Sequence, residues 1–182
     1  NNTELVLGSD VNKDGGNLQT STSSVTAVSN LTISSNDNLS VTTINLGGNT
    51  LSLGSASSNL FISENLSLED ANGALLTGNA DLTVEGDVKL SDGKLSSTGG
   101  TLLFRKGGLQ SGAFEFDLGE STLSLSGIYT KSGGTLTASS ATLKLLDNIT
   151  VSSDSAISFK QLELKNLALT LGSASTDLTI TS

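Results

Sequence analysis

The chain repeats a short phrase in which a polar corner residue is followed by alternating apolar and small polar positions. The phrase is Asn or Asp, an aliphatic residue, usually Ser or Thr, and a second aliphatic residue. It occurs at 30–33, 38–41, 59–62, 65–68, 81–84, 148–151 and 177–180. A period of two is typical of a β-strand, because successive side chains point to opposite faces. Each copy therefore predicts a corner and a very short strand, and the repetition predicts an array.

The spacing of these strands predicts how they are arranged. Three columns of inward aliphatic positions recur at steps of about 20 residues, as expected when one rung of a solenoid stacks on the last. The first column is Leu60, Leu82, Leu102, Leu123 and Leu143; the second is Ile44, Leu66, Val88, Leu109, Ile128 and Ile149; the third is Leu51, Leu75, Leu95, Phe116, Leu136 and Ile157. Paired glycines and Asn-Gly or Asp-Gly steps between the strands supply the positive φ angles that sharp corners need.

We therefore predict an all-β fold, a right-handed parallel β-helix with three short strands per rung of about 20–22 residues and roughly 8–9 rungs. Residues 1–24 are expected to form an N-terminal strand and turn region that leads into the solenoid, and residues 25–182 the β-helix itself. The alternative is an antiparallel sandwich of hairpins, which favours two-residue turns and longer strands.

One internal match leaves the register of the rungs open. The segment LSLGSASSNLFIS at 51–63 closely matches LTLGSASTDLTIT at 169–181, an offset of 118 residues. In the columns above, this offset moves a position from one face of the solenoid to another. Either the register slips near Asp154, or the rungs are longer than the columns imply.

Composition limits the function classes. The chain has no Cys, Trp, Met, Pro or His, so it offers no thiolate chemistry, no disulfide and little for general acid–base catalysis near neutral pH. Its net charge of −9 comes from 18 acidic and 9 basic residues, and a surface of that sign repels phosphate backbones and anionic lipids. No apolar run approaches the ~20 residues of a membrane-spanning helix. We expect no nucleic-acid partner and no membrane span.

One motif suggests a metal. Residues 10–15 place oxygen-bearing side chains at Asp10, Asn12 and Asp14 and a glycine next, as in the first half of a calcium-binding loop. Position twelve of such a loop is a bidentate Glu, but Ser21 stands there. We therefore carry Asp10, Asn12 and Asp14 as candidate calcium ligands, with an Asp- and Gly-rich turn as the alternative, and we expect no other cofactor.

Two pairs of carboxylates deserve comparison with glycosidase sites. Glu115 and Asp117 are two residues apart on one predicted strand, hence roughly 7 Å apart, which falls in the range of inverting glycosidases. Glu85 and Asp87 form a similar pair. Lys94, one rung earlier, could simply pair with Glu115, and solvated charges on a strand face are the ordinary case. We assign no catalytic residue.

The repeat style resembles a known group of proteins. The Gly-Gly-Thr-Leu phrases at 99–102 and 133–136, together with the Asn-Leu-Thr-Ile corners, are similar to the β-helical passenger and stalk regions of bacterial autotransporters and filamentous haemagglutinin-like adhesins. The resemblance covers essentially the whole chain but transfers no site residue. It implies an extracellular segment on the bacterial cell surface that serves reach, adhesion or assembly.

These observations lead to one expected function and one alternative. We expect a non-catalytic structural or adhesive segment of a bacterial extracellular surface protein or self-assembling filament, and not an enzyme. Its expected partners are other copies or further rungs end to end, and surface glycans or a host or neighbouring cell surface. The alternative is a carbohydrate-active β-helix, either a polysaccharide lyase or hydrolase or a tailspike-like protein.

Overall fold

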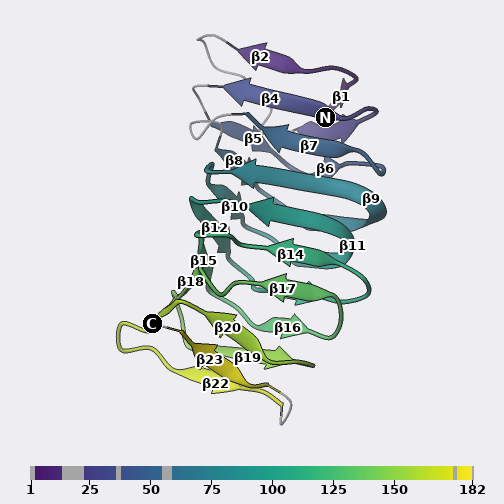
Figure 1. The fold of residues 1–182 in the computed structure, drawn as a ribbon. Coiled ribbons are helices and arrows are strands. Elements are labelled where there is room, and N and C mark those ends of the chain that lie inside the picture. The colour runs from purple at the N-terminus through teal and green to yellow at the C-terminus, as the bar shows by residue number, and fades with distance from the viewer. Residues whose placement is uncertain (1–2, 14–22, 36–37, 55–58, 174–175, 182) are drawn as a thin grey trace.

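The computed structural model describes residues 3–13, 23–35, 38–54, 59–173 and 176–181, and within them the chain is an all-β parallel β-solenoid of about 8 rungs without a helix (Figure 1). The strands form sheets of 3, 7, 11 and 2 strands. Every pairing between described strands is parallel, from the first pair, β1 with β3, to the last, β20 with β23. The predicted fold class is confirmed, and the antiparallel sandwich is wrong.

Each full rung contributes one strand to each of three faces. We number the faces 1, 2 and 3 in the cyclic order in which the chain follows them; the first described strand, β1, belongs to face 2. Face 1 is the 7-stranded sheet. Its strands are β5 (Leu39–Val41), β8 (Leu60–Ile62), β10 (Leu82–Val84), β12 (Thr101–Phe104), β15 (Thr122–Leu125), β18 (Thr142–Leu145) and β21 (Gln161–Glu163).

Face 2 follows face 1 along the chain. Its strands are β1 (Thr3–Leu7), β3 (Ser23–Ala27), β6 (Ile44–Asn45), the first part of β9 (Leu66–Gly78) and of β11 (Val88–Ser97), β13 (Gly108–Gln110), β16 (Tyr129–Lys131), β19 (Ile149–Ser153) and β22 (Leu169–Leu171). Strands β9 and β11 continue around the next corner without a break, which Figure 1 shows as two long curved arrows.

Face 3 completes the rung. It consists of the second parts of β9 and β11 together with β2 (Val11–Lys13), β4 (Leu31–Ser35), β7 (Thr50–Leu53), β14 (Glu115–Asp117), β17 (Thr135–Thr137), β20 (Ile157–Phe159) and β23 (Leu178–Ile180). Strands β1 and β2 pair in parallel with β3 and β4, so the N-terminal residues that the structure describes stack on the same array.

The core is the column of side chains that point inward from the three faces. The first predicted column is confirmed at every step, because Leu60, Leu82, Leu102, Leu123 and Leu143 are direct partners in neighbouring rungs and all are buried. The third column is confirmed from Leu51 to Leu136. Two aromatic rings stack within this core, Phe104 and Phe116, with ring centroids 6.2 Å apart.

The second predicted column is wrong at Leu109 and Ile128, although its last member, Ile149, is inward and buried. Gly108 is the residue that pairs with Val88, so Leu109 points outward and is 41% exposed. In the next rung Tyr129 is the inward residue and Ile128 lies in the corner, 62% exposed. A Cβ on Gly108 would already be in van der Waals contact with the ring of Tyr129 at 3.4 Å and with Val88 at 3.5 Å, so these two neighbours fill the space into which a larger side chain at 108 would extend.

Asn and Asp at the strand entries link successive rungs through their side chains. In each case the side-chain oxygen accepts the backbone N–H of the equivalent residue one rung later. The pairs are Asp10 with Thr32, Asn30 with Thr50, Asn59 with Asp81, Asp81 with Thr101, Asn65 with Asp87 and Asn148 with Ala168, at 2.6–2.9 Å. These pairs lie on all three corners, so this ladder of side-chain to backbone hydrogen bonds is a general feature of the corners.

The two matching segments occupy different faces. At 51–63 the segment supplies β7 of face 3 and β8 of face 1, whereas at 169–181 it supplies β22 of face 2 and β23 of face 3. The offset therefore does move positions from one face to another. The same string of residues fits either pair of faces because every face requires the same alternation of apolar inward and polar outward residues.

Candidate functional site

Two of the three candidate calcium ligands, Asp10 and Asn12, lie at the first described rung. Asp10 is exposed, and one of its carboxylate oxygens accepts the backbone N–H of Thr32 at 2.6 Å. Asn12 lies in β2 opposite Ser34. Asp14 lies outside the described residues, as do Gly15 and Ser21. One oxygen of the predicted loop is thus engaged in the corner ladder, and the calcium loop stays a prediction.

Glu115 and Asp117 lie on β14 of face 3, as expected for outward carboxylates of one strand. The Lys94 ammonium contacts the Glu115 carboxylate at 2.6 Å from the neighbouring rung, which confirms the predicted ion pair. Asp117 accepts the backbone N–H of Gly119 at 3.2 Å. Glu115 is therefore part of a surface ion pair between rungs, and Asp117 accepts a hydrogen bond within its own corner.

Glu85 and Asp87 lie at the corner between face 1 and face 2, on either side of Gly86. The Arg105 guanidinium reaches the Glu85 carboxylate at 3.4 Å, again from the next rung. The backbone N–H of Asp87 donates to Asn65. This pair too is built into contacts between rungs.

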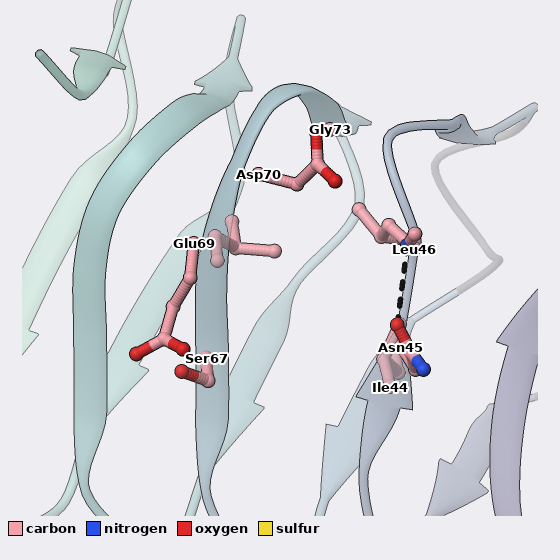
Figure 2. A pocket seen from close by; sticks show the side chains of 9 residues that line it. Ile44, Asn45, Leu46, Ser67, Glu69, Asp70 and Gly73 are labelled. Atoms are coloured by element: carbon pink, nitrogen blue, oxygen red, sulfur yellow. Dashed lines mark hydrogen bonds between the residues drawn. The ribbon is translucent and has the colours of Figure 1, made fainter.

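A hollow in the described surface lies elsewhere, at the corner where β9 turns from face 2 to face 3 (Figure 2). It has a volume of about 400 Å³, in the lower range of ligand pockets. Its polar side chains are Asn45, Ser67, Glu69 and Asp70. Aliphatic side chains, Ile44, Leu46 and Leu68, also line it.

The hollow exists because successive corners differ in length. Leu75 follows its partner Leu51 by 24 residues, whereas Leu95 follows Leu75 by 20, so the corner 69–73 projects beyond the one before it. The earlier corner is tight because Gly47 and Gly48 have φ of 51° and 79°. Sequence analysis missed this hollow, although the longer rung was a signal that could have revealed it.

Its polar groups already have partners. Lys89 forms an ion pair with Glu69 from the next rung, and this hydrogen bond lowers the pKa of the Glu69 carboxyl below its usual range. Asp70 accepts the backbone N–H of Asn72 at 3.2 Å, and Asn45 accepts that of Gly47 at 3.1 Å. The hollow thus presents ionised acceptors suited to hydroxyl groups or a hard cation. Within the described residues, however, no three acidic side chains gather closely enough to hold a metal ion.

A second hollow, of about 360 Å³, lies at the corner between faces 1 and 2. Its floor is Gly107 and Gly108, and the exposed side chains of Leu109 and Ile128 stand beside Lys106. These two aliphatic residues are the ones that the second predicted column placed in the core. Because both are exposed, they form a small apolar surface instead of part of the core.

Comparison of the chain with protein-family models, with curated proteins and with solved structures finds no match. Along the described ranges, no helix is long and apolar enough to cross a membrane. The geometry of the solenoid is therefore the available guide to the function of the chain.

Proposed function

We propose that this chain is a non-catalytic structural segment of a bacterial extracellular surface protein, acting as part of an adhesin stalk or as the subunit of a self-assembling filament. The observation that carries the proposal is the corner ladder, which recurs on all three corners with the same donor and acceptor. A protein built around one site needs one face that differs from the others. A rod whose role is only to keep its shape can use the same corner hydrogen bond on every side.

The matching segments at 51–63 and 169–181 support the same proposal. They place one string of residues on different faces, so no face depends on a special sequence there. The ion pairs agree with this, because Lys89–Glu69, Lys94–Glu115 and Arg105–Glu85 each join neighbouring rungs.

The proposal includes a partner at the edge formed by β21, β22 and β23. Leu171 and Ile180 are 45% and 43% exposed there, whereas the matching residues Leu53 and Ile62 are 6% and 0% exposed beneath a following rung. An edge with exposed inward aliphatic side chains suits the addition of one more parallel rung. We propose that another copy or further solenoid chain supplies it, and that surface glycans or a neighbouring cell are the adhesion targets.

The cellular role is tested by labelling intact cells of the source organism with antibodies raised against this chain. A surface stalk predicts labelling without permeabilisation and loss of the signal after mild protease treatment of whole cells. Labelling that requires permeabilised cells would contradict the proposal.

Stacking is tested by sedimentation of the purified chain over a wide concentration range. End-to-end addition of copies predicts growth of rods with concentration, and Leu171→Lys should suppress it because a charge in the new interface would be buried. Ile128→Lys, the same kind of change at a corner within the solenoid that is 62% exposed, serves as the control. A wild-type chain that stays monomeric at high concentration excludes stacking of copies.

The carbohydrate-active alternative is favoured by one observation, the hollow lined by Glu69 and Asp70. A glycan array and a reducing-sugar assay on the wild type, Asp70→Asn and Glu115→Gln test it. Turnover that disappears in either variant would replace the structural proposal with an enzymatic one.

A further inference from the structure

Three inward positions of face 2 carry polar side chains where the repeat asks for aliphatic ones. Gln110, Tyr129 and Lys131 are 0%, 2% and 5% exposed. Gln110 and Lys131 are direct partners in neighbouring rungs, between Leu90 before them and Ser153 after them. A lysine in the core of a solenoid is costly unless its charge is paired, so its partners matter.

Each polar atom of this cluster is satisfied by a contact to another rung or corner. The Tyr129 hydroxyl donates to the Gln110 side-chain oxygen at 2.7 Å, and the Gln110 amide donates to the backbone carbonyl of Thr135 at 2.7 Å. The Lys131 ammonium donates to Asp154 at 2.6 Å and to the Ser155 hydroxyl at 2.9 Å, both in the following rung. Such contacts are directional, unlike the stacking of aliphatic side chains.

Strand β19, which follows this cluster, could pair with β16 in an alternative register. In β19 the residues Ile149, Val151 and Ser153 all point inward, and Val151 pairs with Tyr129. A slide of two residues would keep the alternation and set Ile149 opposite Tyr129, because the side-chain period of a strand is two. Aliphatic stacking alone favours neither register strongly, because an aliphatic residue, Val151 or Ile149, lies opposite Tyr129 in both.

The polar cluster does distinguish them. A two-residue slide moves the strand by about 7 Å, which carries Asp154 and Ser155 out of reach of the Lys131 ammonium. The buried charge would then lack its partners. We infer that Gln110, Tyr129, Lys131 and Asp154 form a register lock, a device that fixes how the C-terminal rungs stack on the rest of the solenoid.

Cysteine trapping tests the lock on a clean background, because the chain contains no cysteine. Thr130 and Ser152 are outward partners in the observed register, so Thr130→Cys with Ser152→Cys reports that register. Thr130→Cys with Thr150→Cys reports the slid one. Neighbouring strands are about 4.8 Å apart, within disulfide range, whereas the diagonal distance exceeds it.

The two cysteine pairs are compared by mild oxidation in the wild type, in Lys131→Met and in Lys94→Met. Lys94 is the matched control because it makes an ion pair of the same length with the next rung, but its side chain is 35% exposed whereas that of Lys131 is 4% exposed. We expect only the 130–152 disulfide in the wild type and in Lys94→Met. In Lys131→Met, the fraction of the 130–150 disulfide should rise at least ten-fold. A folded Lys131→Met that forms only the 130–152 disulfide overturns the inference.

A double variant covers the case in which Lys131→Met does not fold. Lys131→Met with Asp154→Ala leaves neither charge without a partner, and it should fold and give the 130–150 disulfide as well. If the folded double variant forms only the 130–152 disulfide of the observed register, the inference of a register lock is overturned. Failure of both variants to fold would assign the cluster to stability instead of register, which also overturns it.

Discussion

The side chain of Asn59 and the backbone of Asp81 hold two successive rungs together from both directions. The Asp81 N–H donates to the Asn59 side-chain oxygen at 2.9 Å, while the Asp81 carbonyl accepts the N–H of Leu60 at 2.8 Å. The same two-way contact joins Asn65 to Asp87. A corner that would otherwise leave an N–H without a partner is thereby closed.

Removing this contact should cost measurable stability. We expect Asn59→Ala to lower the free energy of unfolding by about 1–2 kcal/mol, because a backbone donor at the corner loses its acceptor. Asn38 occupies the same corner one rung earlier, and its side chain makes no hydrogen bond to the described residues. Asn38→Ala should therefore change little. Urea unfolding of both variants is the measurement, and equal losses would contradict the role of the ladder.

Gly107 is needed for a different reason. Its φ is +83°, and a Cβ there would lie 1.9 Å from the carbonyl oxygen of Ile128 in the next rung. Gly107→Ala should cost more than about 2 kcal/mol, since it combines backbone strain with a clash against backbone. Gly8 has no positive φ, and its nearest neighbour would lie at 3.4 Å. Thermal unfolding should show little change for Gly8→Ala, and a comparable loss at both sites would refute this account.

The array could be predicted from the sequence because its two main signals are local. Alternation of apolar and polar residues sets which side of a strand faces inward, and the 20-residue step sets which residues stack. Leu82, for example, lies between Leu60 and Leu102 as the spacing implied. Hydrophobic periodicity carries this information for any strand whose neighbours are of similar size.

The parts that could not be predicted depend on contacts between rungs. Leu109 was expected inside because it is aliphatic, but Gly108 takes that place between Val88 and Tyr129, whose side chains fill the space there. Lys131 was not expected inside because its burial depends on Asp154, 23 residues later. The hollow beside Asp70 arises from a difference in length between two corners. None of these is visible in hydropathy alone.

The matching segments provide an internal comparison of burial. Leu53→Ala, at a residue 6% exposed, should cost about 2–4 kcal/mol through lost packing and a cavity. Leu171→Ala, at the matching residue that is 45% exposed, should cost less than about 1 kcal/mol. Denaturant unfolding at low protein concentration compares them. An equal loss would contradict the exposed edge and would mean that this rung is covered in solution.

Tyr129 should make the fold sensitive to alkali. Burial raises the pKa of its phenol, whereas the unfolded chain ionises near about 10. The stability that it contributes is therefore complete below that pH and decreases as the pH rises above it, because only the unfolded state releases the proton. As the only tyrosine, it should show tyrosinate absorbance only on unfolding. Tyr129→Phe should reduce the decrease in stability above pH 10, and reversible ionisation without unfolding would contradict it.

Asp154 should give the opposite dependence on the acid side. The hydrogen bond from Lys131 lowers the pKa of the Asp154 carboxyl below its unfolded value of about 3.9. Its contribution is therefore present above that pH and is lost as the pH falls through the folded pKa. Asp154→Asn should lower the Tm at neutral pH. The difference from wild type should begin to shrink below about pH 4 and close only below the folded pKa, where the wild-type carboxyl is itself protonated. Glu115→Gln, at an exposed ion pair, should show a smaller difference throughout. A gap at Asp154 that stays constant with pH would mean that the carboxylate charge does not stabilise the buried lysine.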